Sequence, residues 1–325
     1  MGTRTRAAII LMLAMLVAAC SSAATTAPTA APTPAAPSAA PSAAPSEAAT
    51  VAPTEAPTPP PNPCAAANLK TLAAGKLTIG TDNPAYPPYY QPDSGKAPAP
   101  WELGDPTNGQ GFESAVAYAI AAKLGYAQGD VTWTVVPFDN SYKPGNKPFD
   151  VYLAQVSFTA DRAQAVDMSD GYYFLSQSVV ALKSNPIAGA KTIADLKAYR
   201  FGAQQGTTSL DTINTTIAPA AKTKIYNTND AAIAALKAKQ IDGLVVDLPT
   251  AFYVTAAQLE DSVIVGQFPS APGGEGEHFS VVLAKGSPLT ACVNGALAAM
   301  KSDGTLEGIT KEWLSDKADA PIFQP

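Results

Sequence analysis

The chain has 325 residues, a formal net charge of −6 and a pI of about 4.8. This charge argues against a nucleic-acid-binding protein, because such proteins present a basic surface to phosphates. The 30 prolines are many and unevenly spread, so the folded part has to be separated from the rest first.

Residues 1–20 have the features of a processing segment. Arg4 and Arg6 precede an apolar run, Ala7 to Ala19, that is too short to cross a bilayer. The run ends in Val-Ala-Ala before Cys20, which resembles the lipobox of bacterial lipoproteins and implies a lipid anchor on this cysteine. An ordinary signal peptide that contains a cysteine is the alternative. No later segment is long and apolar enough to span a membrane.

Residues 21–63 consist almost wholly of Ala, Pro, Thr and Ser. This composition offers nothing from which to build a core, so we expect a disordered tether. Its prolines favour an extended chain, which would hold a folded domain away from a membrane.

Two cysteines remain once Cys20 is assigned to the lipid. In an extracytoplasmic protein, the pair Cys64 and Cys292 indicates a single disulfide. Two buried free thiols are the alternative.

From Cys64 onward, short apolar runs alternate with helical patterns. We expect strands at 77–80, 131–136, 151–158, 178–182, 200–204, 241–246 and 279–284, and helices beginning near 111, 160, 192, 210, 229, 287 and 305. This alternation predicts an α/β fold with mainly parallel sheets flanked by helices. Ligands of such folds bind beyond the carboxyl ends of strands, where Tyr86, Arg162, Thr208 and Asp247 are all expected.

Arg162 is the strongest candidate for a ligand contact. Thr159 is a helix N-cap candidate directly after the predicted strand 151–158, and Arg162 follows three residues later. A guanidinium stays charged, and its planar fork matches a carboxylate in two hydrogen bonds. The helix start also favours an anion. These features suit a small carboxylate ligand; an arginine on a solvated helix turn is the alternative.

Two loops carry further candidates. The prolines between Thr81 and Tyr90 force an extended loop, on which Tyr86, Tyr89 and Tyr90 would either form a ligand wall or pack on the surface. The segment 205–209 (Gln-Gly-Thr-Thr-Ser) places a glycine turn and hydroxyls at a helix start, where several donors face an anion.

The chain resembles the family 3 extracellular solute-binding proteins, the amino-acid receptors of ABC importers. The resemblance is carried, in family order, by GKLTIGTDNPAYPPYY, GFESAVAYAIAAKLG, FDVYLAQVSFTADRAQAVDMSDGYY, FGAQQGTTS, IDGLVVD and GSPL…MKSDGTLEGITKEWL. It implies a periplasmic-binding-protein-like fold of two lobes that are joined by two crossing strands and close on a ligand. Lobe 1 would comprise 64–175 plus 277–325, and lobe 2 would comprise 176–276.

The resemblance also implies the roles of individual residues. Arg162 would clamp the α-carboxylate, Ser157 and Thr208 would add donors, and Asp247 would bind the α-ammonium. Tyr86 would pack on the ligand side chain and Asp82 would reach its polar end. Gln155 and Gln204 occupy positions that vary with the ligand, and Tyr90 and Thr207 complete the predicted set. Asp82 and the glutamines favour a polar or basic amino acid.

The same resemblance implies a monomer without metal or cofactor that works outside the cytoplasm with ABC permease subunits. Three departures leave the shape of the side-chain pocket open: a short 133–150 region without the usual helix, a long 91–109 loop, and GFES in place of GFD. An enzyme on the same fold, similar to a dehydratase, and a ligand-sensing domain are the alternatives. An enzyme needs a placed acid or base, and His278, the sole histidine, is expected on the surface at the second crossover.

Overall fold

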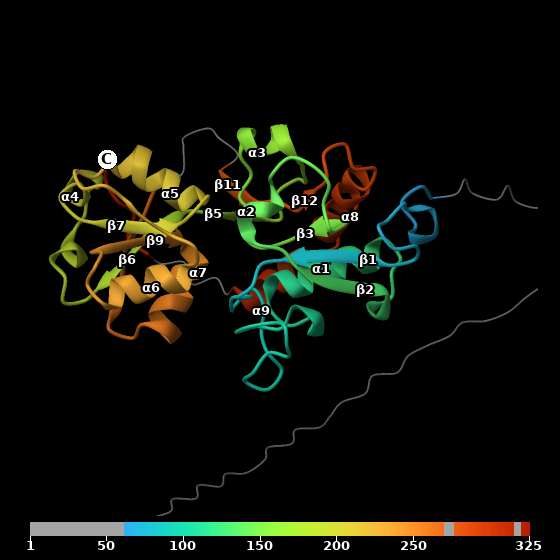
Figure 1. The fold of residues 1–325 in the computed structure, drawn as a ribbon, viewed down its shortest axis with the longest axis horizontal. Coiled ribbons are helices and arrows are strands. Elements are labelled where there is room, and N and C mark those ends of the chain that lie inside the picture. The colour runs from blue at the N-terminus through green and yellow to red at the C-terminus, as the bar shows by residue number, and fades with distance from the viewer. Residues whose placement is uncertain (1–61, 270–275, 315–319) are drawn as a thin grey trace, which may run out of the picture. The chain divides into compact units, whose positions relative to one another are not determined.

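The computed structural model describes residues 62–269, 276–314 and 320–325 (Figure 1). The predicted signal peptide, Cys20 and nearly all of the predicted tether lie outside these residues. The described part contains two five-stranded sheets and one two-stranded sheet. None of its helices has both the length and the apolar character that a membrane crossing needs.

The first sheet has the strand order β2-β1-β3-β12-β4. Its strands are β1 (Leu77–Thr81), β2 (Val131–Val135), β3 (Val151–Tyr152), β4 (Asp167–Met168) and β12 (Val282–Leu283). Strand β1 is parallel to β2 and β3, whereas β12 is antiparallel to β3 and β4.

The second sheet has the strand order β10-β6-β9-β7-β8. Its strands are β6 (Gln177–Leu182), β7 (Phe201–Gln204), β8 (Lys224–Tyr226), β9 (Gly243–Asp247) and β10 (Ser262–Gln267). Strand β7 is parallel to β8 and β9, whereas β6 is antiparallel to β9 and β10.

Two short strands connect the two sheets. Strand β5 (Tyr173–Leu175) pairs antiparallel with β11 (Glu277–Phe279), and both lie between the sheets in Figure 1. The predicted pair of crossing strands is therefore confirmed. The crossovers also explain why each sheet, mainly parallel as predicted, contains one strand of opposite direction, β12 in the first and β6 in the second. Strands β6 and β12 each follow a crossover and enter their sheet from the opposite end to the parallel strands.

Nine α-helices of the described chain flank the sheets. They are α1 (Phe112–Lys123), α2 (Phe138–Ser141), α3 (Ala160–Ala165), α4 (Ile193–Leu196), α5 (Thr208–Thr212), α6 (Asn229–Lys237), α7 (Leu248–Tyr253), α8 (Thr290–Ser302) and α9 (Thr305–Trp313). Short π-helical turns, Ile213–Ile217 and Val254–Gln258, continue α5 and α7.

Several helix starts follow from capping side chains. Thr159 caps α3, and Thr192 forms the predicted capping box with Asp195 at α4. Helix α6 begins at Asn229, as predicted, and its cap Thr228 accepts a hydrogen bond from the third residue of the helix. Helix α8 begins at Thr290, three residues after the predicted start. Helix α2 lies in the region for which no helix was predicted.

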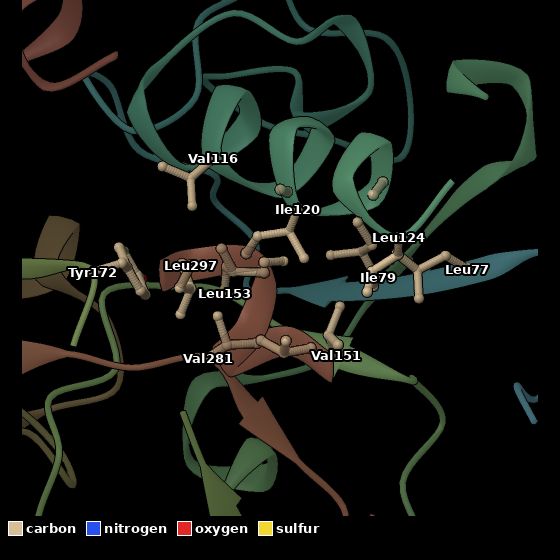
Figure 2. Packing of buried hydrophobic residues seen from close by; sticks show 14 of the residues in the cluster. Leu77, Ile79, Val116, Ile120, Leu124, Val151, Leu153, Tyr172, Val281 and Leu297 are labelled. Atoms are coloured by element: carbon tan, nitrogen blue, oxygen red, sulfur yellow. The ribbon is translucent and has the colours of Figure 1, made fainter. Parts of the chain in front are cut away.

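The core of the first lobe lies between β1, α1 and α8. Leu77 and Ile79 of β1 are fully buried and face Ile120 of α1, and Leu297 of α8 packs beside them (Figure 2). Each fully buried side chain of this size contributes roughly 1.5–3 kcal/mol of transfer free energy. This core keeps the carboxyl end of β1, and therefore Asp82, in a fixed place.

The predicted disulfide between Cys64 and Cys292 is confirmed. The two Cα atoms lie 5.3 Å apart, and the bond closes a sequence separation of 228 residues. It fastens the segment before β1 to α8, within the lobe that contains the first sheet.

Residues 320–325 pack on the second sheet. The backbone N–H of Phe323 donates to the carbonyl of Gln267 at 2.9 Å, and the ring of Phe323 lies 5.2 Å from that of Phe268. Gln324 forms a bridge with Thr192 on the other side. The assignment of 277–325 to lobe 1 was therefore wrong for these last residues, because Phe323 is an apolar side chain that completes the core of the other lobe. The remaining lobe boundaries stay a prediction.

Candidate ligand-binding site

One cleft between the two lobes contains all but one of the predicted ligand-binding residues. Those that line it are Asp82, Tyr86, Tyr90, Gln155, Arg162, Gln204, Thr207, Thr208 and Asp247. Strands β1, β7 and β9 end at or next to Asp82, Gln204 and Asp247, so the topology brings the carboxyl ends of strands from two sheets to one place. Ser157, the exception, lies just behind the lining.

Arg162 bridges the two lobes. Its guanidinium donates one hydrogen bond to the carbonyl of Ser157, after β3, and another of 2.8 Å to the carbonyl of Gly206, after β7. The guanidinium carbon lies 4.6 Å from the centre of the Tyr142 ring and 5.5 Å from that of Phe138. The side chain is only 8% exposed. A buried guanidinium that packs against two aromatic rings is a fixed planar cation.

Hydroxyl groups surround this cation on the second lobe. Thr207 caps α5 by accepting from the N–H of Leu210, and Thr208 is the first residue of that helix. The hydroxyl oxygens of Thr208 and Ser157 lie 3.4 Å apart, across the boundary between the lobes. The helix was predicted to begin near Leu210, but the cap at Thr207 starts it earlier. The arrangement supplies several donors near Arg162 for an anionic group.

Asp247 supplies a half-buried carboxylate in the same cleft. It ends β9, and its Oδ1 accepts a hydrogen bond of 2.6 Å from Gln177 Nε2. Burial raises the pKa of Asp247 well above its usual range, and the nearby Glu277 raises it further, whereas Gln177 and Arg162 act in the opposite direction. A ligand cation at this place would favour the ionised form.

Asp82 provides a second acidic group in the cleft. Burial raises the pKa of Asp82 to about 6, although its Oδ1 accepts from the N–H of Asn83 at 2.8 Å. Tyr86 also lines the cleft, and its hydroxyl accepts from the backbone N–H of Asp230, on the second lobe, at 3.2 Å. The roles predicted for Asp82 and Tyr86 at the ligand side chain stay a prediction.

Gln155 is held in an unusual conformation. Its φ of 53° lies in the left-handed region, which costs a residue with a Cβ roughly 1–2 kcal/mol. The carboxylate of the fully buried Glu113 accepts both from its backbone N–H, at 2.7 Å, and from its side-chain amide. Tyr172 also donates to Glu113, and burial raises the pKa of this carboxyl to about 7. The sequence favoured Glu113 as a negative charge in the first turn of the helix, but did not predict this contact with Gln155.

The tyrosines of the proline-rich loop divide between two roles. Tyr86 and Tyr90 line the cleft, whereas Tyr89 is fully buried in the first core, so neither a wall of three tyrosines nor packing on the surface describes the loop. The ring of Tyr89 packs edge-on against Phe279 of β11, and the ring of Tyr90 packs edge-on against Trp133 of β2. The Tyr90 hydroxyl donates to the carbonyl of Leu153, and the hydroxyls of Tyr89 and Thr250 lie 3.1 Å apart.

His278 lies on β11, at the predicted crossover, but it is buried and not on the surface. Its ring stacks on Phe158 with centres 5.5 Å apart and lies 5.3 Å from the ring of Phe174. These two aromatic side chains cover the histidine ring. No local pattern in the sequence predicted that contact.

Three neighbours of the site were not found from the sequence. Tyr142 stacks on Arg162, and Gln177 and Glu277 surround Asp247. Only Gln177 left a signal, since it is a polar residue at the start of a strand that is buried throughout. Among the described residues, no cluster of three or more His, Cys, Asp or Glu side chains could hold a metal ion.

Comparisons with known proteins agree on one family. The model of the bacterial extracellular solute-binding proteins, family 3, matches residues 77–316. ABC transporter arginine-binding protein 1 of Escherichia coli is 29% identical over 247 residues, which cover 74% of this chain and 92% of the relative. A probable histidine-binding protein of Campylobacter jejuni is 28% identical over 209 residues, or 62% of this chain and 76% of the relative.

A solved structure of an ancestral arginine-binding protein bound to glutamine is 30% identical, with a TM-score of 0.60, and covers 75% of this chain and all of its own. An ancestral amino-acid-binding protein, a precursor of cyclohexadienyl dehydratase, is 28% identical with a TM-score of 0.58 over 74% of this chain and 95% of its own. The family model spans well over half of the 325 residues. The chain therefore belongs to the family 3 bacterial extracellular solute-binding proteins.

Proposed function

We propose that this protein is the extracytoplasmic substrate-binding component of an ABC importer, and that it binds an amino acid between its two lobes. One observation carries the proposal: the buried guanidinium of Arg162 and the half-buried carboxylate of Asp247 line the same cleft. An α-amino acid presents a carboxylate and an ammonium on one carbon atom. A cleft with one fixed cation and one fixed anion matches that pattern.

The charges in the cleft favour a basic side chain. Asp82 and Asp247 supply two carboxylates, whereas Arg162 supplies the single guanidinium among the lining residues. A ligand with one carboxylate and two cationic groups would balance these charges. Relatives whose names specify arginine or histidine support this direction, although relatives that bind cystine and glutamine occur as well.

In this proposal the ligand is not chemically altered while it is bound. The curated relatives named above are binding proteins, and their similarity supports binding without catalysis. After incubation, the ligand should be recovered intact, as judged by its proton NMR spectrum. Accumulation of a new product in step with protein concentration would favour an enzyme of the dehydratase kind.

The anchor belongs to the same proposal. The Arg-rich start and the Val-Ala-Ala-Cys sequence support lipidation of Cys20, with residues 21–63 as the tether. Cys20→Ser should release the protein from membranes into the soluble extracytoplasmic fraction. A variant that stays with the membranes would contradict lipidation at this position.

The test is a thermal-shift screen of the twenty amino acids on the chain without its first 20 residues. A ligand at a hundred times its Kd stabilises the folded state by about 2.7 kcal/mol, so a true ligand raises Tm clearly. L-Arginine is then compared with 5-guanidinopentanoate, which lacks only the α-ammonium. Asp247→Asn should lower the affinity for L-arginine more than the affinity for this analogue. Failure of all twenty amino acids to shift Tm would contradict the proposed function.

A further inference from the structure

Gln177 occupies a central place beside the ammonium end of the cleft. It is the first residue of β6, directly after the first crossover strand, and its side chain is 4% exposed. Its amide nitrogen donates to Asp247 Oδ1 at 2.6 Å and to Glu277 Oε1 at 3.0 Å. Its amide oxygen accepts from the hydroxyl of Ser209, on α5, at 2.6 Å. One side chain thus contacts β9, β11 and α5.

Glu277 brings a second carboxylate to this amide. It is the first residue of β11, the returning crossover strand, and is half-buried. Asp247 Oδ1 and Glu277 Oε1 accept hydrogen bonds of 2.6 Å and 3.0 Å from the same nitrogen. The distance between these two oxygens therefore cannot exceed the sum of the two bond lengths. Two carboxylates this close repel each other, and a cation between or beside them relieves the repulsion.

The hydrogen-bonding chemistry of Gln177 suits a positioning role. An amide nitrogen carries two hydrogens, so it can donate to both carboxylates at once, and it brings no charge of its own. It therefore holds two anions in place without neutralising them. A lysine or arginine here would cancel the negative charge that an ammonium ligand requires.

We propose that Glu277 is a second carboxylate of the ammonium site, and that Gln177 positions it together with Asp247. This inference rests on the proposed function, because it assigns residues to the ammonium end of the same cleft. Glu277 lies on a crossover strand, so the site for the ligand ammonium includes the connection between the lobes. Selectivity for an α-amino acid over its des-amino analogue then depends on three side chains, and not on Asp247 alone.

The first experiment needs no ligand. Carbon-13 NMR of the side-chain carboxyls follows the titration of Asp247 in the wild type and in two variants of the 21–325 chain. Glu277→Gln should lower the pKa of Asp247, because a neighbouring negative charge is removed. Gln177→Leu should raise it, because the ionised carboxylate loses a donor. Arg162 and Glu113, which also act on Asp247, are unchanged in both variants.

The second experiment measures selectivity by calorimetry with L-arginine and 5-guanidinopentanoate. Glu277→Gln should lower the affinity for L-arginine about tenfold and the affinity for the analogue by less than about twofold, because only L-arginine carries the α-ammonium. Gln177→Leu should also reduce the ratio of the two affinities. Glu260→Gln, at an exposed position of the second lobe, removes the same charge outside the cleft and should leave both affinities unchanged.

The two variants thus shift the pKa of Asp247 in opposite directions and change selectivity in the same direction. A general loss of structure would not produce that pattern. An unchanged Asp247 titration in Glu277→Gln would overturn the inference, whatever the ligand results. If the wild type binds both probes equally, recognition of the α-ammonium fails instead, and if it binds neither, the proposed preference for a basic amino acid fails. In both cases the titration still decides whether the two carboxylates are coupled.

Discussion

Arg162 Nη2 lies 2.8 Å from the carbonyl oxygen of Gly206, so the guanidinium proposed to hold the ligand also joins the two lobes. Its other contact, the carbonyl of Ser157, belongs to the first lobe. Both partners are neutral oxygens, so the positive charge stays available to a carboxylate. The contact between the lobes is therefore supported by the same group that would recognise the ligand.

The first prediction concerns this guanidinium. Truncating one partner of a buried, hydrogen-bonded charge pair costs about 2–5 kcal/mol, so Arg162→Ala should weaken the binding of L-arginine at least about thirtyfold. Arg162→Lys keeps the charge but loses the planar fork, and should weaken binding about tenfold. Calorimetry measures both. Arg200→Ala is the control, because Arg200 forms a partly exposed ion pair with Asp242 outside the cleft. Equal affinities for wild type and a folded Arg162→Ala would place the carboxylate site elsewhere.

The second prediction concerns pH. Burial raises the pKa of Asp82 to about 6, so this carboxyl is mostly neutral at pH 5 and ionised at pH 7.5. A ligand guanidinium beside it favours the ionised form, so L-arginine should bind about tenfold more weakly at pH 5 and should release a proton on binding there. Calorimetry in two buffers with different ionisation enthalpies counts that proton. Asp82→Asn should abolish the part of the pH dependence that comes from Asp82. Proton release that persists unchanged in this variant would point to another group, such as Glu113.

The same shift predicts how Asp82 affects stability. The folded pKa of about 6 lies above the ordinary value of 3.8. Between these values the folded protein holds a proton that the unfolded chain has released. The contribution of Asp82 to the free energy of unfolding therefore decreases as pH rises through this window. Urea unfolding of wild type and Asp82→Asn at pH 4.5 and 7 should show the difference, and a slope of the opposite sign would contradict it.

The third prediction concerns the disulfide. By the chain-entropy model, a bond between Cys64 and Cys292 that closes so long a loop stabilises the fold by about 5 kcal/mol, less any strain. The double variant Cys64→Ser/Cys292→Ser should lose much of that stability in urea unfolding. Its affinity for L-arginine should stay within about twofold of the wild type, because neither cysteine lines the cleft. Two free thiols by mass spectrometry of the non-reduced wild type would rule the bond out.

The fourth prediction concerns the last residues of the chain. Phe323 is 2% exposed in the second core, whereas its neighbour Ile322 is 55% exposed. Phe323→Ala should lower the free energy of unfolding by about 3–5 kcal/mol, the usual cost of removing a buried phenylalanine. Ile322→Ala, the matched control, should change it by less than about 1 kcal/mol. Equal effects of the two substitutions would mean that this segment does not pack on the second sheet.

Much of the site could be predicted because ligands of α/β folds bind beyond the carboxyl ends of strands. Asp82, Gln204 and Asp247 follow strands that are recognisable as short apolar runs, and the fold brings those ends together. Arg162 was predictable because Thr159 caps the helix that carries it. These inferences use local patterns of a few residues, which a sequence records directly.

Other features depend on contacts between distant segments. Glu277 lies 100 residues from Gln177, and no local pattern marks their pairing. The burial of His278 depends on Phe158, from the far side of the first crossover. Phe323 could not be assigned to the second lobe, because a lone apolar residue near the chain end has no periodicity to read. Long-range packing decides such positions.

The packing of the C-terminal residues on the second sheet has a practical consequence for measurement. Cys64 is fastened to α8 in the first lobe, whereas Phe323 belongs to the core of the second. Fluorophores attached near these two points would report on different rigid bodies. The efficiency of energy transfer between the two fluorophores should change when the lobes rotate. A chain labelled at these two points could therefore report ligand binding in single molecules.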